Sequence, residues 1–124
     1  MKDDEKLSLE QFTGRGRSYT PIVSLRKSGQ IGFNLGMIQF YDLQNYDGFA
    51  VLYFDAHQQV IGVKLVKKAE EGAYRFSIKR GNATISAKSF FNYYKIPVNE
   101  AHRYAPTWSD EYKMFLIDLK TQQS

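Results

Sequence analysis

The sequence contains no cysteine, only two histidines and no apolar run long enough to cross a membrane. The lack of cysteine excludes disulfides, thiolate zinc sites and cysteine nucleophiles, and it fits a reducing cytoplasm, where we expect the protein to reside. The longest apolar run, FAVLYF at residues 49–54, is far shorter than the roughly 20 residues of a spanning helix. The start, MKDDEKLSLEQ, is charged and has no apolar core, so we expect neither a signal peptide nor a membrane partner.

Residues that support catalysis are also scarce. His57 lies in a predicted turn near Asp55, where a histidine is usually solvated, and His102 lies in a predicted loop. The glycines form no phosphate-binding loop, no local pattern indicates a serine nucleophile, and no carboxylate pair has a spacing typical of acid–base catalysis. No cluster of metal ligands is evident. We therefore expect a protein that is not an enzyme and that uses no cofactor or metal.

What the sequence does contain is enough apolar material for one core, with a slight excess of positive charge. Of the 124 residues, 43% are hydrophobic and 15% aromatic, which suits a single compact domain. The formal net charge is +4. All of this excess lies in residues 67–124, which carry ten bases and six acids. A modest basic balance permits nucleic-acid binding without requiring it.

A polar tail is predicted at residues 1–18, before a domain at residues 19–124. The tail lacks periodicity and contains TGRGR, in which two glycines add backbone freedom around Arg15 and Arg17. Two interpretations stay open. The tail is either a disordered terminus or a flexible basic arm that reaches a phosphate backbone.

Alternating apolar residues predict a mainly β domain with two short helices. The predicted strands are residues 22–25 and 31–33 around the turn KSGQ, 49–54 and 60–66 around DAHQQ, 74–79 and 83–85 around RGN, and 112–119. The first helix, LGMIQFYDL, follows Asn34 as its cap, and the second, KSFFNYYKI, opens at Ser86 or Ala87 and ends before Pro97. Residues 98–111 are predicted to be a loop. FAVLYF is apolar throughout, which predicts burial on both faces.

The chain also contains an internal similarity. Ser24–Leu43 aligns with Ser77–Ile96 at an offset of 52 or 53, so that SLRKSGQIGF corresponds to SIKRGNATIS and Asn34 to Ser86. Further on, FAVLYFD aligns with KMFLIDL. The pattern predicts two β-β-α-β units, at about residues 19–68 and 72–120, that share one core about a pseudo-two-fold axis. We expect a β-barrel of about seven strands.

Each unit resembles the swapped-hairpin DNA-binding domains of the AbrB and MraZ families. The first copy supplies RKSGQIGFN, the helix LGMIQFYDL, NYDGFAVLYFD and QQVIGVKLV, and the second supplies IKRGNATIS, KSFFNYYKI and YKMFLIDL. The family's proline after the second strand is Asn34 in one copy and Ser86 in the other. The resemblance implies an intertwined β-barrel that binds DNA through bases near the hairpin and the helix. We therefore predict a small DNA-binding protein, for example a transcriptional regulator.

The basic residues near the hairpins are the candidate DNA contacts, because lysine and arginine neutralise phosphates. The predicted contacts are Arg15, Arg17, Arg26, Lys27, Lys79, Arg80 and Lys88. The alternative is that these charges only solvate the ends of the hairpins.

The aromatic residues suggest a different function. Five lie in or beside the predicted helices, namely Tyr41, Phe90, Phe91, Tyr93 and Tyr94. They are interpreted as stacking platforms for single-stranded bases or as core and interface residues. Exposed aromatics would favour a protein–protein interaction or assembly module, and we leave the oligomeric state open, a homo-oligomer included.

Overall fold

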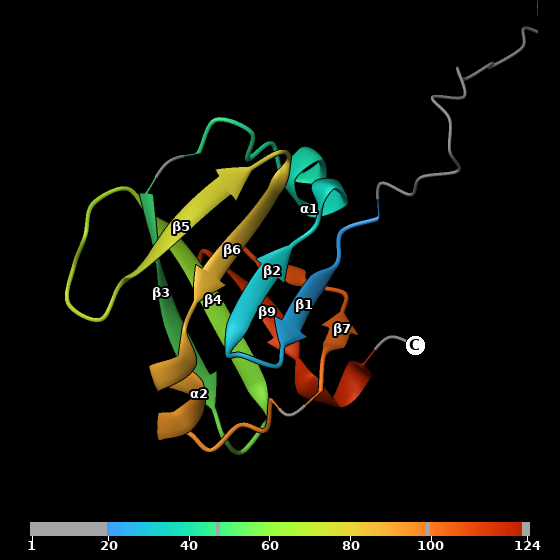
Figure 1. Cartoon of the computed structure of the whole chain (residues 1–124), viewed down its shortest axis with the longest axis vertical. Coiled ribbons are helices and arrows are strands. Elements are labelled where there is room, and N and C mark those ends of the chain that lie inside the picture. Colours follow the sequence, from blue (N-terminus) through green and yellow to red (C-terminus); the bar gives the residue numbers. More distant parts are fainter. Residues whose placement is uncertain (1–19, 47, 99, 123–124) are drawn as a thin grey trace, which may run out of the picture.

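The protein folds as a nine-stranded antiparallel sheet, strongly curled into a half-barrel, with two short α-helices (Figure 1). The computed structural model describes residues 20–46, 48–98 and 100–122. The elements are β1 (Val23–Arg26), β2 (Gln30–Phe33), α1 (Leu35–Phe40), β3 (Gly48–Asp55), β4 (Val60–Val66), β5 (Tyr74–Lys79), β6 (Asn82–Ser86), α2 (Lys88–Tyr93), β7 (His102–Tyr104), β8 (Thr107–Ser109), β9 (Met114–Asp118) and a short 3-10 helix, η2 (Leu119–Thr121). None of the helices in the described part of the chain is long and apolar enough to cross a membrane.

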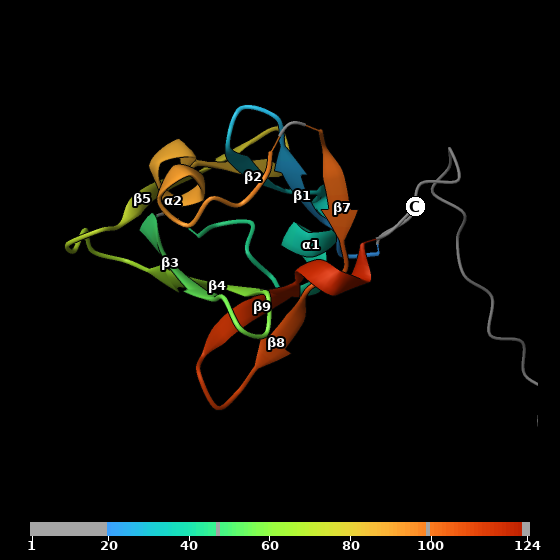
Figure 2. The same cartoon turned by 90° about the horizontal axis from the view of Figure 1, so that it is seen from below.

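The curl of the sheet folds it into two facing layers. The strand order is β7-β1-β2-β6-β5-β3-β4-β9-β8. We call the strands β7, β1, β2, β6 and β5 layer A, and the strands β3, β4, β9 and β8 layer B (Figure 2). The two edge strands, β7 and β8, are separated in the chain by only Ala105 and Pro106. The Cα atoms of Tyr104 and Thr107 therefore lie within about 11 Å of each other, which requires a strong curl.

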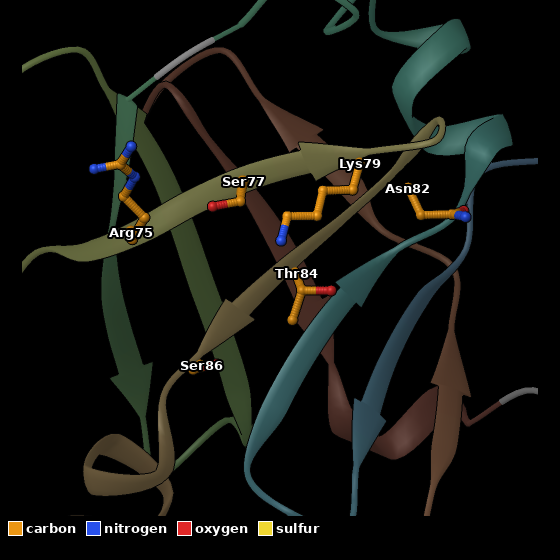
Figure 3. A pocket seen from close by; sticks show the side chains of 6 residues that line it. All are labelled: Arg75, Ser77, Lys79, Asn82, Thr84 and Ser86. Atoms are coloured by element: carbon orange, nitrogen blue, oxygen red, sulfur yellow. The ribbon is translucent and has the colours of Figure 1, made fainter.

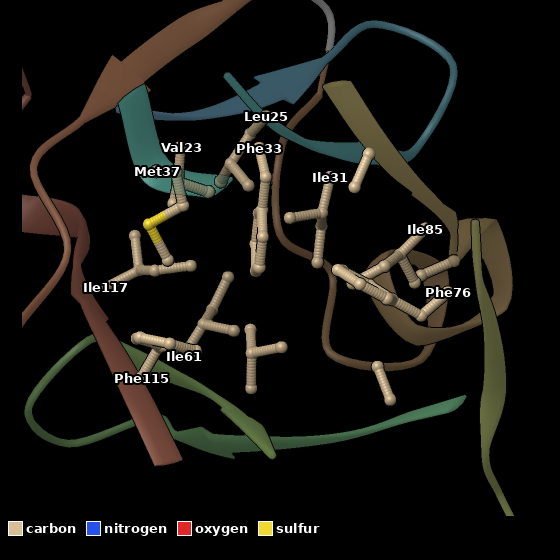
Figure 4. Packing of buried hydrophobic residues seen from close by; sticks show 14 of the residues in the cluster. Val23, Leu25, Ile31, Phe33, Met37, Ile61, Phe76, Ile85, Phe115 and Ile117 are labelled. Carbon is tan, nitrogen blue, oxygen red and sulfur yellow. The ribbon is translucent and has the colours of Figure 1, made fainter. Parts of the chain in front are cut away.

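The hydrophobic core fills the space between the layers (Figure 4). Phe33 of β2 lies near its centre. Its ring meets Phe76 of β5 edge to face at a centroid distance of 5.4 Å, and it meets Phe115 of β9 at 6.0 Å. Of the described polar side-chain atoms, none is buried without a hydrogen-bond partner. One continuous core thus joins both layers, because the same ring packs on both.

Two expectations about the strands are wrong. Residues 98–111 are not all loop, because β7 and β8 form there and raise the strand number to nine. Each has only three residues, too few to show an alternating pattern, and each exists because an edge strand of the sheet offers it hydrogen bonds. FAVLYF is also not buried on both faces. Tyr53 is 44% exposed, since the described chain leaves the outer face of layer B uncovered there.

The caps of the two helices differ. Asn34 caps α1 as expected, and its Oδ1 accepts hydrogen bonds from the backbone amides of Met37 at 2.7 Å and Ile22 at 3.0 Å. Ser86 is not the cap of α2, because it pairs with Gln30 in the β2–β6 ladder. Ala87 occupies the cap position and makes no side-chain hydrogen bond.

The two helical segments have the same backbone geometry at an offset of 53. Each helix ends in a tyrosine cap followed by a left-handed residue, with φ of 57° at Asp42 and 55° at Lys95. The backbone amide of the following residue then donates a hydrogen bond to the carbonyl five residues earlier. Leu43 donates to Ile38 at 2.8 Å, and Ile96 donates to Phe91 at 2.9 Å. The two helices have the same length and the same C-terminal geometry although their sequences and N-caps differ, so the local conformation is shared more closely than the residue identities.

Each hairpin turn packs on the helix that follows the other hairpin. A Cβ atom on Gly29 would lie 2.7 Å from the Cα of Lys88, at the start of α2. A Cβ atom on Gly81 would lie 2.9 Å from a methyl carbon of Leu35, at the start of α1. The β1–β2 turn accordingly points toward α2 and the β5–β6 turn toward α1 (Figure 1). Both turn glycines also have φ above 80°, a conformation that glycine adopts without strain.

The third strands of the two units do not match. If the two units were equivalent, β3 would pair with β5 and β9 would pair with β1. β3 does pair with β5, but the described partners of β1 are β2 and β7. The alignment of FAVLYFD with KMFLIDL is also wrong in register, because it puts the buried Phe115 on Val51. In β3 the core-facing residues are Ala50 and Leu52, on either side of Val51. A strand alternates its faces at every residue, so the alignment is shifted by one position.

Candidate nucleic-acid interface

The outer face of layer A carries only polar, basic and glycine residues. Side chains alternate along each strand, so the residues between the core positions point outward. The register puts Ser24, Gly32, Thr84 and Ser77 in one row across β1, β2, β6 and β5. The neighbouring outward positions are Arg26, Gln30, Ser86, Arg75, Lys79, Asn82 and Arg103. This face can donate many hydrogen bonds.

The charge on this face has one sign. Arg26, Arg75, Lys79 and Arg103 are the charged residues of the five strands of layer A, and no Asp or Glu occurs in these strands. Arg75 also packs over the Phe49 ring of β3, with its guanidinium carbon 5.7 Å from the ring centroid. Strands that contribute cations and no carboxylate give this face a positive charge, which attracts anions.

A cavity of about 440 Å³ lies over β5 and β6 on this face. Its lining is Arg75, Ser77, Lys79, Asn82, Thr84 and Ser86 (Figure 3). The Lys79 side chain extends over the sheet between Ser77 and Thr84. Ammonium, guanidinium, hydroxyl and amide groups are the side-chain donors that proteins use to contact phosphate oxygens. The cavity therefore suits a phosphate group chemically.

Arg26 is held flat against the sheet. A Cβ atom on Gly32 would overlap the Arg26 guanidinium group, so this group lies directly over the Gly32 backbone. Gly32 pairs with Thr84 across β2 and β6, and Thr84 lines the cavity that contains Lys79. The glycine thus lets Arg26 reach toward the middle of the face.

The structure brings some of the predicted contact residues together and separates others. Arg26 and Lys79, aligned at an offset of 53, share the outer face of layer A. Lys27 and Arg80 are exposed at the tips of the two hairpins, at opposite ends of this face, and Lys88 is exposed beside Gly29. Arg15 and Arg17 lie outside the described residues.

Sequence reasoning missed two basic residues of this face. Arg75 alternates with Phe76 on a predicted strand, so its outward direction was available as a signal. Arg103 lies in β7, in the segment that was predicted to be a loop. Its place opposite Ser24 of β1 comes only from the pairing of strands far apart in the sequence.

The aromatic residues near the helices fall into two groups. Phe90 and Phe91 are buried, and Tyr41 packs against the core, so these three are core residues. Tyr93 is 78% exposed at the end of α2. Tyr94 contacts Tyr93 at a ring-centroid distance of 4.8 Å and Phe54 of β3 at 5.1 Å. With Phe54 they form a small aromatic cluster at the end of α2, and none of these residues lines the cavity of layer A.

The residues that were considered for catalysis, His57 with Asp55 and His102, lie in a turn and in a strand. Asp55 Oδ1 accepts a hydrogen bond from the Gln58 backbone amide at 2.9 Å and so stabilises the β3–β4 turn that contains His57. His102 lies in β7. Within residues 20–46, 48–98 and 100–122, no three His, Asp or Glu side chains gather as metal ligands would.

Comparison of the whole chain with known proteins gives no relative from which a function can be read. No family model, no curated protein and no solved structure matches it. The resemblance to the AbrB and MraZ families therefore depends on the short motifs alone. The function has to be argued from the geometry of the outer face of layer A.

Proposed function

We propose that the protein binds DNA through the outer face of layer A and acts as a small cytoplasmic transcriptional regulator. The observation that carries the proposal is that four cations and a row of hydroxyl and amide donors share one face, whose strands contain no acid. Phosphate neutralisation supplies most of the affinity of a protein for DNA. Base contacts, by contrast, determine the sequence that is bound.

A pseudo-two-fold arrangement of two units supports this proposal. Gly32 and Thr84 are equivalent at an offset of 52, and they pair with each other in the β2–β6 ladder. A local two-fold axis through this pair relates Arg26 to Lys79. The equal helix ends and the crossed packing of Gly29 and Gly81 follow the same relation. We infer a swapped-hairpin architecture of the AbrB type, in which two equivalent basic patches meet phosphates on two sides of a groove.

The hairpin tips extend the basic surface at both ends. Lys27 and Arg80 are exposed there, and Lys88 lies beside the β1–β2 turn. These three residues, with Arg15 and Arg17 of the N-terminal segment, are proposed as outer contacts to the backbone. Arg26 and Lys79 are proposed as the central contacts because they lie nearest the two-fold axis.

The salt dependence of DNA binding tests the proposal. A variant with Arg26, Arg75, Lys79 and Arg103 changed to Gln is titrated with duplex DNA between low and moderate salt. Its matched control changes Lys64, Lys67, Lys68 and Lys113 to Gln, which removes the same four charges from other parts of the chain. We expect the slope of log K against log salt to flatten by about 3.6 in the first variant if all four residues contact phosphates, since each phosphate contact contributes roughly −0.9. Equal affinities and slopes for the two variants would overturn the proposal.

The alternative function, a protein–protein assembly module, stays a prediction. Several aromatics are exposed, among them Tyr53, Tyr93 and Tyr112. These residues lie on different elements, for example Tyr93 at the end of α2 and Tyr53 on the outer face of layer B. Light scattering at high protein concentration tests this alternative, and a strict monomer would contradict self-assembly.

A further inference from the structure

A second cavity lies between the segment after α1 and the strands β4, β8 and β9, and it shares no lining residue with the basic face. It has a volume of about 310 Å³. Its lining is Tyr41, Leu43, Tyr46, Leu65, Trp108, Lys113 and Phe115. Trp108 pairs with Phe115 across β8 and β9, so both rings point to the inner side of layer B. The segment after α1 forms the opposite wall.

Aromatic rings held in fixed orientations form the walls of this cavity. The ring centroid of Phe115 is 4.8 Å from that of Trp108 and 4.8 Å from that of Tyr41, both edge to face. The Trp108 indole nitrogen donates a hydrogen bond to Asp110 Oδ1 at 2.9 Å, which fixes the indole plane. Trp108 is still 39% exposed, so the cavity is open to a ligand. Preformed aromatic walls of this kind favour flat apolar ligands.

Among the residues that line the cavity, Lys113 is the charged one, and the nearby Asp110 carboxylate accepts the hydrogen bond of the Trp108 indole nitrogen. Lys113 lines the cavity, and the Lys67 ammonium lies 5.1 Å from the centroid of the Tyr46 ring. Burial raises the pKa of the Tyr46 phenol above its ordinary value. Of the described residues that line the cavity, none is acidic.

The backbone at Lys113 is in an unusual conformation. Its φ is 56°, in the left-handed region, and its amide donates to the Ser109 carbonyl at 2.8 Å. Glycine adopts this conformation more easily than lysine does. Asp42, Gln59, Arg80 and Lys95 have nearly the same φ, so at Lys113 this conformation belongs to the β8–β9 turn, which holds the residue beside the cavity.

We propose that this cavity binds a small planar aromatic acid, with its ring between Trp108 and the tyrosines and its carboxylate at Lys113. The volume lies at the lower end of the range for ligand pockets, which suits one or two fused rings. Lys113 is the charged residue of the lining, and we expect it to favour an anion over a neutral or cationic analogue, while the Asp110 carboxylate is engaged by the Trp108 indole. The site is separate from the outer face of layer A, so the two proposals stand or fall independently.

The test uses the chain's single tryptophan as its reporter. The indole N–H resonance of Trp108 is followed by NMR while 2-naphthoate, 2-naphthamide or 2-(aminomethyl)naphthalene is added. We expect a saturable shift with naphthoate and binding of the amide weaker by about fivefold, the effect of one exposed ion pair. The amine is expected to bind more weakly still.

Two variants separate recognition of the carboxylate from general affinity for aromatics. In Lys113→Gln the preference for naphthoate over the amide is expected to disappear. In the control Lys64→Gln, on the outer face of β4, the preference is expected to persist. The absence of a saturable shift up to about 5 mM naphthoate, or equal affinity for all three compounds in the unaltered protein, would overturn the proposal.

Discussion

The two layers of the half-barrel share one structural feature, a glycine covered by a long side chain, although the outer face of layer A is basic and that of layer B is largely apolar. Each layer has a buried glycine in a central strand, and a long side chain from a neighbouring strand lies over it. In layer A the Arg26 guanidinium covers Gly32, and in layer B the Met114 thioether covers Gly62. A glycine lets a long side chain lie flat on a sheet because it has no Cβ.

The two layers differ in the charges that their strands carry. The strands of layer A carry four bases and no acid, whereas those of layer B carry Lys64, Asp55 and Asp118. The outer groove of layer B, about 440 Å³ in volume, is lined largely by apolar and aromatic residues such as Tyr53, Tyr112 and Leu116. One core therefore supports two chemically different outer faces, a basic one at layer A and a largely apolar one at layer B.

The largest expected effect tests whether the layers fold as one body. Phe33→Ala removes the ring that contacts Phe76 in layer A and Phe115 in layer B, and a deletion of this size from a core costs about 3–5 kcal/mol. Tyr53→Ala, on the outer face of layer B, should cost less than about 1 kcal/mol. Urea unfolding followed by Trp108 fluorescence and by circular dichroism measures both. Non-coincident transitions for the two probes would show that the layers unfold separately.

A matched pair of substitutions at the two covered glycines tests the difference in function. Gly32→Ala must displace the Arg26 guanidinium, the far end of a flexible side chain, so we expect little change in stability. DNA affinity should fall about fivefold, because one charged contact is misplaced. Gly62→Ala displaces Met114 and should leave DNA affinity unchanged. If both substitutions change DNA affinity alike, layer A is not the binding face.

The smallest effect is expected at an exposed acid of layer B. Side-chain and backbone hydrogen bonds from Lys120 lower the pKa of Asp118 below its ordinary value. The interaction therefore stabilises the fold fully at any pH above the ordinary pKa of an aspartate. This stability is lost as the pH falls through the lowered pKa of the folded state. Asp118→Asn should therefore lower the urea midpoint slightly at neutral pH and not in strong acid. Glu100→Gln is the control, and a difference that grows in acid would contradict this prediction.

Much of the fold was predictable because the signals were local. The hairpin turns, the alternation of residues 74–79 and the Asn34 cap follow from adjacent residues, and all appear in the structure. β7 and β8 were not predictable, because a three-residue strand has no periodicity of its own. The shifted alignment of β3 with β9 has a related cause, since both segments are so apolar that their facing is ambiguous.

The candidate site was predictable only in part. Arg26 and Lys79 were identified from the similarity of the two hairpins, and the structure puts them on one face. Arg103 was not identified, because only the pairing of β7 with β1 brings it there. The inner cavity was missed entirely, because its lining comes from four separate segments of the chain.

The sequence alone determined the class of the fold, the paired hairpins and the positions of the two short helices. These depend on alternation, turn residues and caps, which act between neighbours in the chain. Only the tertiary structure decided which bases share a face and which aromatics enclose a cavity. The curl of the sheet sets those distances, and it results from how the two layers pack around a common core.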